Sequence, residues 1–147
     1  MVTFEQFIQK VGAAKSQLDV ARIREAYDFA KQQLKGIYRL SGDSMLNHCL
    51  VVADNLMSFK PDESSVIAAL LHDLYKTPGY DLDKIRAKFG DDVATLVGGM
   101  EKLQGVHLKG GKNDLEVFRR MFLSMASDLR LVLIRLADLL HNMETLD

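Results

Sequence analysis

Two histidines and two aspartates lie in apolar segments of this chain, where polar side chains are uncommon. His72 and Asp73 follow the apolar run 66–71, and His48 and Asp138 lie in similarly apolar surroundings. Burying one such group without a partner is costly, so four of them in a small domain require a cation or a dense hydrogen-bond network. Imidazole nitrogens and carboxylate oxygens together bind divalent ions such as Mn, Fe, Co and Zn. The sequence therefore predicts a mononuclear metal centre with open positions for water and a substrate oxygen.

Each residue of this set also has a simpler interpretation. A single buried histidine or aspartate is more often a hydrogen-bonded structural residue than a metal ligand. Asp138 in particular could pair with Arg135 or cap a turn. Asn142 follows Asp138 by one helical turn on the same face, where its amide could orient water or a substrate hydroxyl, or be an ordinary surface amide. The occurrence of all four residues in apolar contexts favours the metal centre.

The overall composition limits the classes of function. With 147 residues and 48% hydrophobic residues, the chain fits one domain, residues 1–147, with a substantial core. A net charge of −1 offers no general basic surface for nucleic acid or an anionic membrane. The single cysteine excludes an internal disulfide, and neither a leader peptide nor an apolar segment of membrane-spanning length is present. We therefore expect a soluble, cytoplasmic protein.

Helical periodicity recurs along nearly the whole sequence, which predicts an all-α bundle of about seven to eight helices. The expected helices cover residues 3–12, 19–34, 44–58, 61–73, 82–89, 93–103, 114–126 and 128–145. Pro61 is expected to open the helix that carries His72 and Asp73, because proline is tolerated in a first turn. The glycine-rich basic stretch 104–113 is expected to be a mobile loop that could cover an anionic substrate. The leucine-rich last helix is expected to be central.

His48, the pair His72-Asp73 and Asp138 resemble the H…HD…D signature of the HD-domain metal-dependent phosphohydrolases. More narrowly, the chain resembles the hydrolase domain of the RelA/SpoT bifunctional alarmone enzymes and of their small stand-alone relatives. The resemblance covers nearly all of 26–146, and its motifs are residues 26–30, 38–42, 68–73, 89–94 and 136–146. The last motif, taken together with the Arg39-x-Ser41-Gly42 loop, is specific to that family.

The resemblance implies hydrolysis of the 3′-pyrophosphate of guanosine tetra- or pentaphosphate with a bound manganese ion. The partner it implies is therefore a phosphorylated nucleotide. Matched by position, the implied metal ligands are His48, His72, Asp73 and Asp138. Arg39 and Ser41 match a loop that contacts the guanine base, Asn142 matches a substrate-contacting asparagine, and Thr145 lies at the matching helix end.

The run after the His-Asp pair departs from the pattern of active alarmone hydrolases. Those enzymes continue His-Asp-x-x-Glu-Asp, and the two acids position and activate water, whereas this chain has Lys76 and Thr77. An ammonium does not accept a proton at neutral pH unless its pKa falls far. Other HD phosphohydrolases carry His-Asp-x-x-Lys, which implies that Lys76 contacts a substrate phosphate and offsets developing charge. Lys76 could also be an exposed helix-end lysine favoured by the helix dipole.

Three hypotheses about function follow. The domain could be an HD phosphohydrolase acting on the alarmone or another phosphorylated substrate. It could instead be catalytically degenerate and bind a nucleotide as a regulatory module, or be a purely structural scaffold. Leu40 stands where the family commonly has a basic residue, which weakens the case for tight binding of a highly charged nucleotide. Because the chain ends at Asp147, directly after the last motif, a longer parent with a following synthetase domain is a further expectation.

Overall fold

The computed structural model describes residues 2–14, 17–104, 116, 119 and 128–145. The α-helices in these ranges are α1 (Phe4–Ala13), α2 (Val20–Gln33), α3 (Met45–Leu56), α4 (Glu63–Leu71), α5 (Leu82–Phe89), α6 (Asp91–Gln104) and α8 (Leu129–Glu144). Two 3₁₀ helices, η1 (Met57–Phe59) and η2 (Leu74–Lys76), follow α3 and α4. The described residues form no β-strand, only one isolated bridge between Tyr38 and Ser44. The all-α prediction is confirmed.

Side-chain caps set the starts of the first three helices. Thr3 and Gln6 form a reciprocal capping box at α1, with distances of 3.2 Å and 3.0 Å between side-chain oxygens and backbone nitrogens. Asp19 accepts a hydrogen bond from the backbone of Arg22 at α2, and Ser44 does the same for the third residue of α3. Each cap satisfies a backbone N–H that has no partner within the helix.

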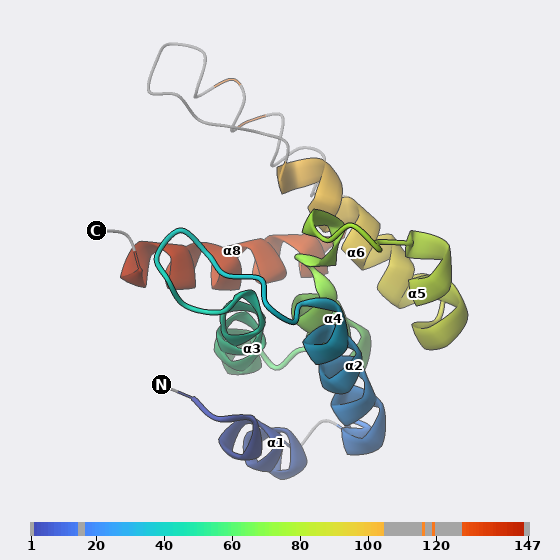
Figure 1. The fold of residues 1–147 in the computed structure, drawn as a ribbon. Helices are drawn as coiled ribbons and strands as arrows, with labels where there is room; N and C mark the ends of the chain where they lie inside the picture. Colours follow the sequence, from blue (N-terminus) through green and yellow to red (C-terminus); the bar gives the residue numbers. More distant parts are fainter. Residues whose placement is uncertain (1, 15–16, 105–115, 117–118, 120–127, 146–147) are drawn as a thin grey trace.

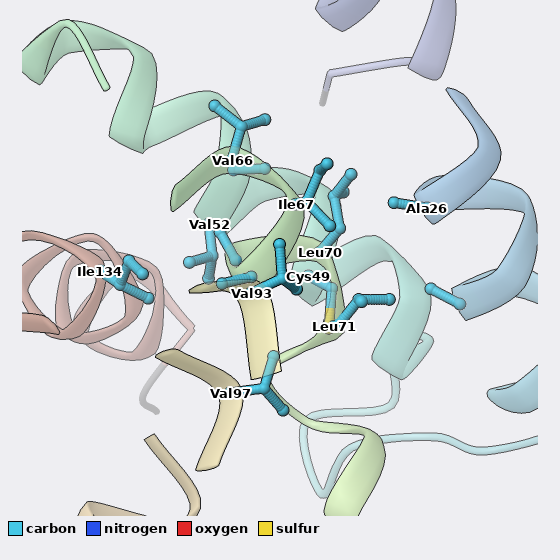
Figure 2. Packing of buried hydrophobic residues seen from close by; sticks show 14 of the residues in the cluster. Ala26, Cys49, Val52, Val66, Ile67, Leu70, Leu71, Val93, Val97 and Ile134 are labelled. Carbon is cyan, nitrogen blue, oxygen red and sulfur yellow. The ribbon is translucent and has the colours of Figure 1, made fainter. Parts of the chain in front are cut away.

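Helices α3 and α4 lie at the centre of the bundle (Figure 1). Helix α3 packs against α4 and α8, while α4 also packs against α2 and α6. Helix α5 packs against α6, and α1 contacts α2 and α3. Figure 2 shows apolar side chains from five of these helices meeting in one core, among them Ala26, Val52, Ile67, Leu70, Val93 and Ile134. No helix in the described ranges is long and apolar enough to cross a membrane.

Helix α4 differs from its prediction at both ends. It begins at Glu63 rather than Pro61, because the side chain of Asp62 caps it by accepting from the backbone of Ser65 at 2.9 Å. It ends at Leu71, so the His-Asp pair lies after the helix instead of within it. The ring of His72 contacts the carbonyl oxygen of Ala69 at 2.6 Å, which occupies a last-turn acceptor that lacks a helical N–H partner.

Helix α8 packs against the core with one face, while its other face remains exposed. Leu131, Ile134 and Ala137 are buried. Leu136 and Leu140 remain 39% and 46% exposed, because the contacts of α8 with α3, α4 and α6 leave this face uncovered by the described helices. The predicted loop after Gln104 and most of the predicted helix 114–126 lie outside the described residues.

Arg130 joins the starts of three helices. Its guanidinium lies 3.0 Å from the carboxylate of Asp62, the N-cap of α4, and 2.7 Å from that of Asp92 in the first turn of α6. It also lies 2.7 Å from the carboxylate of Asp128, the N-cap of α8. These hydrogen bonds from Arg130 lower the pKa of Asp92 and of Asp128. One cation therefore fixes the relative positions of α4, α6 and α8 at this end of the bundle.

We predict that Arg130→Gln weakens the fold in a pH-dependent way. A carboxyl with a lowered folded-state pKa stabilises the protein above its unfolded-state pKa of about 3.9, and this stabilisation is lost as the pH falls through the folded-state value. The substitution should reduce the free energy of unfolding by about 1 kcal/mol at pH 7, since partly exposed pairs are screened by solvent. The loss should shrink below pH 4. Urea unfolding at pH 7, 4 and 3 measures both effects.

Arg86→Gln is the matched control. Arg86 pairs with Asp83 and Asp91, whose side chains are 87% and 89% exposed, so its loss should change stability by less than about 0.5 kcal/mol. If Arg130→Gln and the parent protein lost stability equally between pH 7 and pH 3, the proposed role of Arg130 would be wrong.

Candidate metal centre

Four buried polar side chains from three segments meet inside the bundle. His48 comes from α3, His72 and Asp73 from the turn after α4, and Asp138 from α8, and none is more than 3% exposed. Nε2 of His48 lies 3.2 Å from Oδ2 of Asp73 and 3.0 Å from Oδ1 of Asp138. Nε2 of His72 lies 3.1 Å and 3.5 Å from the same two oxygens. The four predicted metal ligands are thus brought together.

The spacing of these atoms fits a single divalent ion. Ligand atoms bound at about 2.1 Å lie about 3.0 Å apart at right angles and about 3.4 Å apart at tetrahedral angles. Nδ1 of His72 can contact the Ala69 carbonyl only as a donor, which leaves a lone pair on Nε2 of the neutral ring. Among the described residues, this buried Nε2 has no hydrogen bond of normal geometry. An unsatisfied imidazole nitrogen facing two carboxylates is what a metal ligand requires.

Each aspartate turns one oxygen inward and pairs the other with a cation. Oδ1 of Asp73 lies 3.1 Å from the ammonium of Lys76, three residues later in the chain. Oδ2 of Asp138 pairs with the guanidinium of Arg135, three residues earlier. Pairing of Asp138 with Arg135 and a role as a metal ligand are therefore compatible, because they use different oxygens.

Both aspartates are ionised at neutral pH. Burial favours the neutral form of Asp73, but the positive charge of His72 and hydrogen bonds from both histidines hold the pKa of Asp73 well below its usual range. Burial likewise opposes ionisation of Asp138, whereas hydrogen bonds from His48 and His72 lower its pKa. Burial also disfavours a charged His72, yet the neighbouring charge of Asp73 raises the pKa of His72 well above its usual value. Without an ion, imidazole protons therefore balance the carboxylates, and a divalent ion would have to displace them to find the neutral ring and its lone pair. The carboxylates therefore carry the charge that a metal ligand needs.

His141 contacts this centre, although sequence reasoning gave it no role of its own. Its Nδ1 lies 2.7 Å from Nδ1 of His48, and the two rings stack with centroids 5.0 Å apart. Burial, together with the positive charges of His48 and Arg39, lowers the pKa of His141. The available signal was its position three residues after Asp138, which places both on one helix face.

Cys49 is the second unassigned neighbour. Its sulfur lies 4.0 Å from Oδ2 of Asp73, and its side chain is fully buried. Figure 2 shows it within the apolar core. Burial raises the pKa of this thiol, so Cys49 is a neutral packing residue beside the centre.

Two of the residues expected at the substrate lie beside the centre. The guanidinium of Arg39 donates to the side-chain oxygen of Asn142 at 2.8 Å, and the amide nitrogen of Asn142 lies 3.5 Å from Oδ1 of Asp138. The loop that carries Arg39 is closed by Asp43, which pairs with this guanidinium at 3.2 Å and accepts from the hydroxyl of Ser41. Arg39 thus joins the loop to the metal-binding side of α8, while Ser41 lies further out.

Lys76 and Thr145 each contact a residue of the site or its neighbour. The side chain of Lys76 is 41% exposed, so its ammonium contacts Asp73 and also solvent. The hydroxyl of Thr145 donates to the backbone carbonyl of His141 at 2.9 Å, which completes the last turn of α8. The substrate roles of both residues stay predictions.

Comparison with known proteins places this arrangement in a family. The sequence profile described as the HD domain matches residues 26–147. The chain belongs to the HD-domain family. The predicted resemblance is confirmed at this level, and the all-α bundle is the architecture that this family shares.

Three curated relatives of this HD domain are RelA/SpoT-type proteins. The bifunctional (p)ppGpp synthase/hydrolase SpoT of Escherichia coli strain K12 is 35% identical over 99% of the chain. The probable guanosine-3′,5′-bis(diphosphate) 3′-pyrophosphohydrolase of Synechocystis is 40% identical over 83%, and the probable GTP pyrophosphokinase of Mycobacterium leprae is 40% identical over 84%. The chain spans only 16% to 21% of the length of these relatives.

We predict that Asp73→Asn abolishes tight binding of a divalent ion by the HD domain. The substitution keeps the side-chain shape but removes the inward negative charge, so the dissociation constant for Mn²⁺ should rise about 100-fold or more. At 100 times its dissociation constant, Mn²⁺ should stabilise the parent protein by about 2.7 kcal/mol. Calorimetric titration and thermal unfolding with added Mn²⁺ measure these effects.

Asp28→Asn, at an exposed position of α2, serves as the control and should leave both quantities unchanged. A parent protein that is purified without chelator, contains no ion and is not stabilised by Mn²⁺ would refute the metal centre.

Proposed function

We propose that this HD domain is a manganese-dependent phosphohydrolase that removes the 3′-pyrophosphate of guanosine tetra- or pentaphosphate. The observation that carries the proposal is that each of two imidazole nitrogens lies within 3.0–3.5 Å of each of two carboxylate oxygens, beside Arg39 and Asn142. The names of the Synechocystis and Escherichia coli relatives supply the substrate class. Its proposed setting is the cytoplasm, within a longer RelA/SpoT-type chain.

The charges around the centre favour a polyanionic substrate. The two aspartates are balanced by Lys76 and Arg135, which hold their outer oxygens. A divalent ion would therefore leave the centre with a net positive charge. Positive potential in a partly closed site attracts phosphate groups and stabilises the charge that develops on them during transfer.

The residues of this chain have separate roles in the proposed reaction. A divalent ion in such a shell supplies Lewis acidity, which lowers the pKa of water and offsets charge on phosphoryl oxygens. Lys76, half-exposed next to Asp73, places an ammonium where a phosphate would approach. Asn142 orients the substrate, and Arg39 with Ser41 contacts the base. Since Arg39 is hydrogen-bonded to Asn142, base binding by the loop would act on a side chain that lies 3.5 Å from Asp138.

Lys76 and Thr77 replace the acidic pair expected of active alarmone hydrolases, so no side-chain base acts from that position. Burial would lower the pKa of Lys76, but the charge of Asp73 raises it, and Lys76 remains an ammonium at neutral pH. Thr77 is 7% exposed and its hydroxyl donates to the carbonyl of Leu74 at 2.7 Å. This substitution supports a second candidate function, in which the domain binds the nucleotide without hydrolysing it and acts as a regulatory module.

A hydrolysis assay distinguishes the two candidate functions. Guanosine tetraphosphate, with a panel of other nucleotides and phosphomonoesters, is incubated with the protein and Mn²⁺, and released pyrophosphate or phosphate is measured. The hydrolase predicts turnover that Asp73→Ala removes, with a loss of about 10³-fold or more for an essential metal ligand. Saturable binding without turnover would replace the hydrolase by the regulatory module. Neither binding nor turnover of any of these compounds would refute both proposals.

We predict that Lys76→Met lowers kcat/KM for guanosine tetraphosphate by about 10- to 100-fold, because a cation near the reacting phosphate is lost. Lys76→Arg should retain part of the activity, since it keeps the charge. Lys31→Met, at an exposed position of α2, is the control for loss of one positive charge. Equal kcat/KM in Lys76→Met and the parent protein would assign Lys76 a merely structural role.

Replacing Lys76→Glu together with Thr77→Asp introduces the acidic pair that the resemblance implies for active alarmone hydrolases. Hydrolysis that appears only in this double variant would identify the natural domain as degenerate. Because Thr77 is buried, the circular dichroism spectrum and melting temperature of the double variant must first match those of the parent protein.

A further inference from the structure

The contact between His48 and His141 connects α3 and α8 at the metal centre. Both side chains are buried, with 3% and 5% of their surface exposed, and their Nδ1 atoms lie 2.7 Å apart. At this distance one nitrogen must carry the hydrogen and the other must present a lone pair. The direction of this one hydrogen bond decides whether His48 can bind a metal.

We infer that His141 is a positioning residue for the metal centre. When a metal is bound, it accepts a hydrogen bond from Nδ1 of His48 and holds that ring in the tautomer whose Nε2 has a lone pair for the ion. The reverse direction would place a hydrogen on Nε2 of a neutral His48, pointing at carboxylate oxygens 3.0 Å and 3.2 Å away. A ring in that tautomer could not be a ligand. The inference rests on the proposed metal centre.

The other three candidate ligands support this direction, because each pairs its outer atom and leaves its inner atom toward the centre. His72 has the Ala69 carbonyl behind its Nδ1, and the outer oxygens of the two aspartates are paired with cations. His141 is the corresponding outer partner of His48. With this contact, each of the four candidate ligands has a partner on the side that faces away from the centre.

Helix α8 holds His141 in place on both sides. Asp138 is one turn earlier on the same helix. The candidate ligand Asp138 and His141, which accepts from the candidate ligand His48, therefore move together. The backbone N–H and the hydroxyl of Thr145 both donate to the carbonyl of His141, at 3.1 Å and 2.9 Å. Thr145 therefore fixes the helix end that positions this ring. Loss of such an outer partner commonly weakens metal binding by about 10- to 100-fold.

His141→Leu and His141→Asn form a matched pair of variants. Leucine fills much of the volume but accepts no hydrogen bond, whereas the asparagine side-chain oxygen lies near the position of the lost Nδ1. We expect the dissociation constant for Mn²⁺ to rise about 10- to 100-fold in His141→Leu and to recover in His141→Asn to within about threefold of the parent. Calorimetry gives the constants, and thermal unfolding without metal checks that each variant is folded.

The tautomer of His48 can be measured by NMR on the unmodified protein, so the inference remains testable if either variant fails to fold. With diamagnetic Zn²⁺ bound, long-range ¹H–¹⁵N correlation spectra should show His48 protonated at Nδ1 and unprotonated at Nε2. Protonation at Nε2, or Mn²⁺ affinity in a folded His141→Leu equal to that of the parent, would overturn the inference.

Neither measurement requires turnover. A protein that binds Mn²⁺ with this tautomer but hydrolyses nothing would remove the proposed hydrolase and leave the role of His141 intact. A protein that binds neither Mn²⁺ nor Zn²⁺ would remove the role of His141 together with the metal centre.

Discussion

Burying two carboxylates and two imidazoles at one point constrains this bundle more than any other feature. Each group needs compensation away from water, and the low dielectric makes a missing partner costly. The structure meets this requirement with two oppositely directed contacts per side chain, one inward to the shared centre and one outward to a fixed neighbour. Several local features, from the end of α4 to the position of Arg135, follow from these outward contacts.

The same requirement determines how the helices are held. The centre takes residues from α3, from α8 and from the turn after α4, so a shift of any one segment would separate the charges. Helix α8 is fixed twice: Arg130 ties its first turn to the starts of α4 and α6, and its last turns carry Asp138 and His141. Fixing both ends leaves little freedom for α8 to slide along α3. The apolar core supplies cohesion, while these polar contacts set the register.

The sequence was informative wherever a property is local. The caps at Thr3, Asp19 and Ser44 follow from side-chain chemistry within three residues, and the metal ligands stood out as polar groups in apolar runs. It was insufficient where long-range contacts decide. Helix α4 ends before His72 because that ring has partners elsewhere, and the role of His141 depends on a residue 93 positions away. The exposed face of α8 could not be predicted either, since apolar content alone does not say what covers a helix.

Lys76 stands where a glutamate is expected in active alarmone hydrolases, and this difference affects more than the presence of a catalytic base. In this chain the ammonium holds the outer oxygen of Asp73, so it helps to direct the other oxygen toward the centre. A carboxylate at the same position would repel that oxygen and would need a different partner, such as water, to separate the two charges. Ligand orientation and local net charge therefore change together with the catalytic group. Any account of activity in this domain must treat Lys76 and Asp73 as a pair.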